Sequence, residues 1–192
     1  MAFDPKPFFA SLRAGLLGPT LSKNEVTGCD AILAAMSGAP LAHCAYALAT
    51  AYHETAATMQ PVREAYWLSE TWRKSHLRYY PWYGRGYVQL TWDTNYKRAD
   101  SELGLGGKLV KDLDLAMDPA IAARIMRRGM DEGWFAGDGS GRHSLKRHLP
   151  TSGPATLSQF TAARRIINGR DKDTLIARHA IQFQNALQKG GW

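Results

Sequence analysis

The sequence LAHCAYALATAYHETAATM, at residues 41–59, is the stretch around which we expect the rest of the chain to fold. Alanine and other small residues fall on all faces of a helix of this sequence, and a helix without a polar face is typically buried. Glu54 is its one acidic residue, and burying a carboxylate is costly unless a partner compensates its charge. The pattern predicts a central helix over residues 41–59 that neighbouring helices approach closely.

Apolar side chains recur at helical spacing along most of the remaining chain, which favours an all-α domain. Residues 22–25 have the form of a capping box, and Asp118-Pro119 is a strong start signal for a helix. Residues 79–89 carry too many rings and glycines for a helix, so we expect a loop with a small β-hairpin there. The other helices are expected over residues 8–17, 25–36, part of 62–77, 93–103, 119–135, 156–167 and 173–188.

Size and composition indicate a globular protein. The 192 residues, 45% of them hydrophobic, suit one domain over residues 1–192, divided into two lobes around a groove. Lys plus Arg number 24 against 17 Asp plus Glu, which gives a formal charge of +7. Such an excess raises the local concentration of nucleic acid, acidic lipid headgroups or acidic cell-wall polymers. A solubilising surface charge explains +7 nearly as well, so charge alone leaves the partner open.

Cysteine content and the N-terminal segment bear on the compartment. Cys29 and Cys44 are the only cysteines, too few for a disulfide framework or a metal site, so we expect two reduced thiols, with a bridge left open. Residues 1–7 lack the apolar core of a signal peptide. No apolar run approaches the roughly 20 residues that span a bilayer. We therefore expect a chain made in the cytoplasm, without stable membrane insertion, that reaches any outside substrate by another route.

The pair His53-Glu54 invites comparison with the zinc-protease motif HExxH, which needs a second histidine one helical turn later. Residue 57 is Ala57, so that motif is absent, and the histidines are scattered without ligand spacing. We therefore expect neither a metal nor any other cofactor.

Glu54 and Glu64 fit the two carboxylates of glycosidic cleavage, in which one acid protonates the leaving oxygen and the other acts on water or the sugar. A carboxyl group on a tightly packed helix would have its charged form disfavoured, which raises its pKa as a proton donor requires. Glu64, in a more open polar loop, can stay ionised. The alternative is that Glu54 simply pairs with a nearby arginine. Residue chemistry alone leaves both interpretations open.

Aromatic residues are dense between residues 66 and 92. Sugars stack on such rings, but small helical domains also use rings as core. Stacking of nucleic-acid bases on a basic surface is a third interpretation. No nucleic-acid-binding motif accompanies it, so we do not expect a nucleic-acid partner.

Three blocks of sequence carry a family resemblance: His53-Glu54-Thr55; the run YGRGYVQLTW at residues 83–92, continued by Asn95-Tyr96; and RIING at residues 165–169. Together they resemble glycoside hydrolase family 19, the chitinase family that also includes many phage endolysins. The resemblance extends over roughly residues 25–188. It implies a two-lobed, lysozyme-like fold with a central cleft.

The resemblance also implies roles for individual residues. Glu54 would be the general acid, Glu64 the base that activates water, and Thr91 the hydroxyl that helps to hold this water. Asn95 would bind substrate, and its i, i+4 spacing from Thr91 would let both face the cleft. Further substrate-binding positions implied by the three blocks and the last helix are His53, Tyr83, Arg85, Tyr87, Gln89, Asn168 and Arg178.

The sequence departs from the family pattern at three places. Ala56-Ala57 stands where many members have two glycines. The gap between Glu54 and Glu64 is short, as in the endolysin branch rather than the plant chitinases. The acidic residue that plant members carry just after Ile-Asn-Gly has no clear equivalent near residues 170–172.

The expected activity is hydrolysis of β-1,4 bonds in an N-acetylhexosamine polymer, with inversion at the anomeric carbon. Peptidoglycan is the preferred substrate because the chain is basic and compact, and chitin is the alternative within the same class. This profile resembles an endolysin of a Gram-negative phage or prophage, a monomer that reaches the periplasm after holin-type release. Two alternatives have other chemistry: a catalytically silent wall-sugar-binding module, and a single-acid lytic transglycosylase for which Glu64 would be dispensable.

Overall fold

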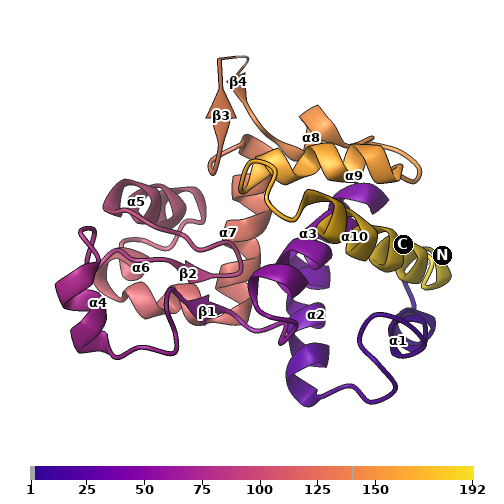
Figure 1. Ribbon diagram of the computed structural model, residues 1–192, viewed down its shortest axis with the longest axis horizontal. Helices are drawn as coiled ribbons and strands as arrows, with labels where there is room; N and C mark the ends of the chain where they lie inside the picture. Colours follow the sequence, from indigo (N-terminus) through magenta and orange to yellow (C-terminus); the bar gives the residue numbers. More distant parts are fainter. Residues whose placement is uncertain (1–2, 140) are drawn as a thin grey trace.

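The structure, a computed structural model, describes residues 3–139 and 141–192 as two helical lobes (Figure 1). Met1 and Ala2 of the N-terminal segment, and Ser140, lie outside the described residues. The predicted all-α class is confirmed, because strand in the described part of the chain is limited to two antiparallel pairs of two-residue strands. The pair β3 (Gly137–Asp138) and β4 (Gly141–Arg142) was not predicted.

The larger lobe is built around the predicted central helix. This helix, α3 (Leu41–Glu54), packs along the C-terminal helix α10 (Asp173–Lys189), and every side chain from Ala42 to Ala51 is buried. Alanines allow this close approach because they add little bulk between helix axes. The surrounding helices are α1 (Pro5–Arg13), α2 (Lys23–Ala35), α8 (Leu145–His148), α9 (Leu157–Ala163) and the 3-10 helix η2 (Arg164–Ile166).

The smaller lobe has a separate apolar core around Leu90, Tyr96, Leu109 and Ile125. Its two strands pair antiparallel, with Arg63 opposite Arg85. The lobe contains β1 (Val62–Arg63), α4 (Glu70–His76), β2 (Arg85–Gly86), α5 (Asp93–Glu102), α6 (Lys108–Lys111) and the 3-10 helix η1 (Leu113–Met117).

Helix α7 (Pro119–Glu132) joins the lobes, and one of its faces serves each core. Ala122 and Met126 belong to the core of the larger lobe, and Ile125 to that of the smaller. Asp118 caps its first turn by accepting from the Ile121 amide, as predicted. The helix ends at Glu132 rather than at residue 135, because Gly133 adopts a left-handed conformation, φ +67°.

Helix α3 also ends earlier than the sequence predicted, at Glu54 instead of residue 59. The Thr55 hydroxyl donates back to the Ala51 carbonyl at 2.8 Å and accepts from the Met59 amide at 3.0 Å, which closes a tight turn. Ala56, Ala57 and Met59 have positive φ. Gly28 of α2 makes room for this turn, since a Cβ there would lie 1.8 Å from the Met59 carbonyl oxygen. Glu54 is therefore placed at the end of a helix rather than within it.

Two other expectations concern thiols and membranes. Cys29 and Cys44 are free and buried in the structure, and burial raises the pKa of both thiols. In the described part of the chain, every helix is too short or too polar to cross a bilayer. Helix α1 begins and ends earlier than predicted, and α3 ends earlier than predicted. Helices α2 and α9 have the capping boxes that their sequences encode.

Candidate functional site

The Glu54 carboxylate is paired with a buried arginine. Arg164 Nη1 donates to Glu54 Oε1 at 2.7 Å, and Arg164 Nε donates to the Asp171 carbonyl at 2.8 Å. The Arg164 side chain is 1% exposed and that of Glu54 is 20% exposed. The arginine pairing raised as an alternative is therefore present. The purely packed setting predicted for Glu54 is wrong, because the helix ends there and a guanidinium from η2 lies beside it.

Glu54 lines a pocket of about 340 Å³ between the two lobes. Its walls come from the end of α3, the segment before α5, α5 itself, and the segments after α7 and η2. Four further residues implied by the family resemblance share this pocket: Gln89, Thr91, Asn95 and Asn168. Apolar side chains, among them Trp92 and Phe135, complete the lining. The fold thus gathers five predicted site residues from distant parts of the sequence.

The segment before α5 is bent so that its polar side chains reach this pocket. Gln89 and Trp92 have positive φ, +52° and +74°. The Thr91 hydroxyl donates to the Gln89 carbonyl at 2.8 Å, and Asn95 Nδ2 donates to the Thr91 carbonyl at 2.8 Å. Thr91 precedes α5, which begins at Asp93, so the predicted single helical face is wrong. The bent backbone, rather than helix periodicity, brings Thr91 and Asn95 to the same cavity.

Glu64 lies on the smaller lobe and does not line the Glu54 pocket itself. Its Oε1 accepts from the Tyr79 hydroxyl at 2.5 Å, and its Oε2 accepts from the Gly84 amide at 2.9 Å. A Cβ at Gly84 would lie 2.7 Å from Gln89 Oε1, so Gly84 packs directly on a residue of the pocket. Burial and the hydrogen bond to Glu64 raise the pKa of Tyr79 to about 12, which keeps this phenol a donor.

Three residues of the second sequence block belong to the framework instead. Tyr87 is fully buried in the core of the larger lobe and donates to the Met59 carbonyl at 3.1 Å, so the prediction that it lines the groove is wrong. Tyr83 and Arg85 are 1% and 4% exposed, and the Arg85 guanidinium stacks 3.7 Å from the Tyr83 ring centroid. Neither lines the Glu54 pocket.

Two further predicted residues, His53 and Arg178, are not part of the pocket lining. His53 is half-buried beside Glu54, and burial together with His53 lowers the pKa of His179 on α10. Arg178 is exposed on α10. Among the described residues, no group of three or more His, Cys, Asp and Glu side chains is placed to hold a metal ion.

Comparisons with known proteins identify the fold. No protein-family model and no curated protein matches the sequence. Chitinase C from Streptomyces griseus HUT6037 is similar in structure, with a TM-score of 0.59 and 19% identity over 93% of this chain and 75% of that chain. A mutant of chitinase C gives a TM-score of 0.57 and 18% identity over 97% and 92% of the two chains. A bacterial family 19 chitinase gives 0.52 and 22% identity over 93% of each chain.

The chain has the fold of the family 19 chitinases. At these identities the likeness establishes the fold alone.

Sequence reasoning missed three residues that hold the two carboxylates: Arg164, Tyr79 and Gly84. Arg164 directly precedes the RIING block and lies between Ala163 and Arg165 in a predicted helix. An arginine pair next to apolar residues could have indicated a buried charge, but the sequence does not show which of the two arginines is buried. Tyr79 and Gly84 are two among many rings and glycines of one loop, and nothing in the sequence ranks them above their neighbours.

Proposed function

We propose that this protein is a glycoside hydrolase that cleaves β-1,4 bonds of an N-acetylhexosamine polymer. The observation that carries the proposal is the pocket between the lobes, in which Glu54 lies with Gln89, Thr91, Asn95 and Asn168. One carboxyl group, one hydroxyl and three amides suit a chain of sugars that present hydroxyl and acetamido groups. The shared fold with family 19 chitinases supports the same activity class.

In the proposed reaction Glu54 protonates the leaving glycosidic oxygen. Arg164 is its positioning residue: it fixes one carboxylate oxygen and compensates the negative charge left after proton transfer. Glu64 takes a proton from the attacking water, which the Thr91 hydroxyl helps to orient. Because Glu64 acts on water rather than on the sugar, we propose inversion at the anomeric carbon.

Peptidoglycan is the substrate that we propose, since a charge of +7 suits an anionic wall polymer. In this role the protein would be a monomeric endolysin that reaches the wall in the periplasm by holin-type release. Chitin is the second candidate, and it is supported by the chitinases among the similar structures.

Mass spectrometry of digests of purified peptidoglycan and of chitin oligomers tests the substrate. Muramic acid at the reducing end of the products would support a muramidase. Rapid cleavage of chitin with no product from peptidoglycan would exclude the preferred substrate. Anhydro-sugar products that persist in a Glu64→Gln variant would instead identify a lytic transglycosylase.

The substitution Glu54→Gln tests whether the protein is an enzyme at all. We expect a loss of about 100- to 10,000-fold in turnover, because the general acid is removed, while wall binding is kept. Turnover is measured on the better substrate of the digests, and binding by co-sedimentation with insoluble wall. Retained activity in Glu54→Gln would contradict the acid assignment, and a wild-type protein that binds wall without any product would be a binding module.

A further inference from the structure

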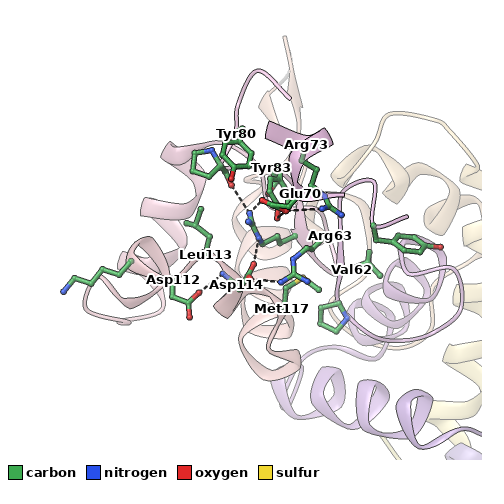
Figure 2. A pocket seen from close by; sticks show the side chains of 15 residues that line it. Val62, Arg63, Glu70, Arg73, Tyr80, Tyr83, Asp112, Leu113, Asp114 and Met117 are labelled. Atoms are coloured by element: carbon green, nitrogen blue, oxygen red, sulfur yellow. Dashed lines mark hydrogen bonds and ion pairs between the residues drawn. The ribbon is translucent and has the colours of Figure 1, made fainter. Parts of the chain in front are cut away.

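A second and larger cavity, of about 770 Å³, lies in the smaller lobe and shares no residue with the Glu54 pocket (Figure 2). We call it the arginine pocket. Its walls come from β1 and the residues around it, α4, residues 80–85, the end of α6 and η1. Volumes of this size are typical of ligand sites in proteins.

The β1–β2 pair separates this cavity from the proposed catalytic groups. Arg63 and Arg85 are cross-strand partners, and such partners point to the same face of a sheet. Both reach Asp114 on that face: Arg63 Nη2 at 2.7 Å and Arg85 Nε at 2.9 Å. Glu64, the next residue after Arg63, points to the other face, where Gly84 and Gln89 lie. The arginine pocket is therefore a site apart from the Glu54 pocket.

The arginine pocket contains two guanidinium groups, those of Arg85 and Arg73, that donate their hydrogen bonds to other groups of the protein. Arg85 donates to Asp114, to the carbonyls of Pro81 and Tyr83 and to the Tyr96 hydroxyl. Arg73 donates to Glu70 and to two main-chain carbonyls in the loop after β1. These two side chains are 5% and 6% exposed, so they form a fixed base, and Asp114 and Glu70 offset part of their charge.

Arg63 is placed differently. Its side chain is 39% exposed, and its one ion pair in the described residues is with Asp114, which Arg85 also binds. Figure 2 shows Arg63 between Val62 and Asp114, on the wall of the cavity. The lining as a whole carries four cationic and three acidic side chains, one positive charge in excess. Tyr66, 60% exposed, adds a ring to the lining and makes an edge-to-face contact with Trp67.

We propose that the arginine pocket binds a carboxylate-bearing group of the wall polymer, with Arg63 as the cation that contacts it and Tyr66 as the ring that covers it. A guanidinium fork matches a carboxylate in shape and charge, and one bound carboxylate neutralises the excess charge of the lining. Naming the wall polymer as the source rests on the proposed function. Peptidoglycan carries carboxylates on its stem peptides, whereas chitin carries none, so such a site would favour the former.

The test is a binding titration with N-acetylmuramyl dipeptide, which has a free terminal carboxylate and no sugar–sugar bond to cleave. The wild-type protein is titrated by NMR with this compound, with its methyl ester and with acetate. We expect the acid to bind, to bind more tightly than acetate, and to shift signals of residues 61–66 and 111–117. We expect the methyl ester to bind about tenfold more weakly, because a charge-assisted hydrogen bond is lost.

Variants locate the effect. Arg63→Gln should weaken binding of the acid about tenfold and leave binding of the ester unchanged. Tyr66→Ala, at a 60% exposed position, tests the same pocket without removing an ion pair. Arg13→Gln, an exposed arginine on α1, is the matched control and should bind like the wild type. Circular dichroism confirms that each variant is folded.

Three results would overturn the proposal: equal binding of acid and ester, equal binding of acetate and muramyl dipeptide, or shifts confined to residues 88–95 of the Glu54 pocket. None of these results depends on hydrolysis. Failure of the proposed function is recognised separately, by the absence of cleavage products from peptidoglycan.

Discussion

The two carboxylates at the proposed site are held in opposite ways. Glu54, on the larger lobe, is fixed by the buried Arg164, a full charge that comes from 110 residues further along the chain. Glu64, on the smaller lobe, is fixed by a phenol and a main-chain amide within 20 residues of it. The first arrangement joins distant helices and therefore bears on stability. The second is local to one loop and bears on the position of a single side chain.

The largest effect is expected from Arg164→Ala. Removing one partner of a buried ion pair leaves the other charge uncompensated, so we expect the free energy of unfolding to fall by about 3 kcal/mol, the low end of the usual range because Glu54 is partly exposed. Denaturant titration measures it. Arg165→Ala, the exposed neighbour, is the control and should change little. Equal effects of the two substitutions would show that the Glu54 pair does not tie the helices together.

Gly84→Ala should come next. The new methyl group would meet Gln89 Oε1 at 2.7 Å, and the resulting shift displaces both Gln89 and the amide that holds Glu64. We expect a loss of about 1–3 kcal/mol in stability and a clear loss of activity. Gly139→Ala is a suitable control, because nothing lies within 4 Å of a Cβ there. Wild-type activity in Gly84→Ala would mean that Gln89 yields without disturbing Glu64.

Tyr79→Phe removes only the hydroxyl that donates to Glu64. We expect activity to fall about tenfold or more, because Glu64 loses a donor that fixes its position. The unfolding midpoint should change little, because both side chains are partly exposed and water can replace the lost hydrogen bond. Initial rates and thermal melts of the same preparation separate the two effects. A variant that loses stability but keeps its activity would show that the Tyr79 contact bears on stability and not on the position of Glu64.

The smallest effect concerns pH. Burial lowers the pKa of His43, His148 and His179 from the ordinary value of 6.5. The unfolded chain takes up these protons first as pH falls, so this stability is full above about pH 6.5 and is lost as pH drops below it. We expect the free energy of unfolding to fall between about pH 7.5 and pH 5.5 in denaturant titrations. His179→Gln should reduce the loss. An unchanged dependence of the free energy of unfolding on pH would show that other groups cause it.

Much of the architecture was predictable because it is encoded locally. Capping residues at Ser22, Asp118 and Thr156 begin helices where the sequence indicates, and alanines at residues 45–51 predict the buried central helix. The predictions failed where a distant contact decides the backbone. The turn that ends α3 is closed by Thr55, but it also needs the space that Gly28 of another helix leaves, which no local pattern at residues 55–59 reports.

The sequence predicted part of the lining of the candidate pocket, but not the arrangement of the residues around it. Glu54, Gln89, Thr91, Asn95 and Asn168 share one pocket, as the sequence blocks implied. The prediction for Tyr87 was wrong because a loop in which rings and glycines alternate does not reveal which ring points into the core. The Tyr87 ring packs in the core of the larger lobe, and its hydroxyl donates to the Met59 carbonyl, which is in place only once α3 has ended.

By itself the sequence determined the helical class, the central helix and the residue types of the candidate site, since composition, caps and periodicity act within a few residues. The tertiary structure decided which groups hold each carboxylate and which face of β1–β2 each side chain joins. The pairing of Glu54 with the buried Arg164 exists only when the end of α3 and the start of η2 are brought together, because an ion pair requires proximity in space and the sequence records only proximity along the chain.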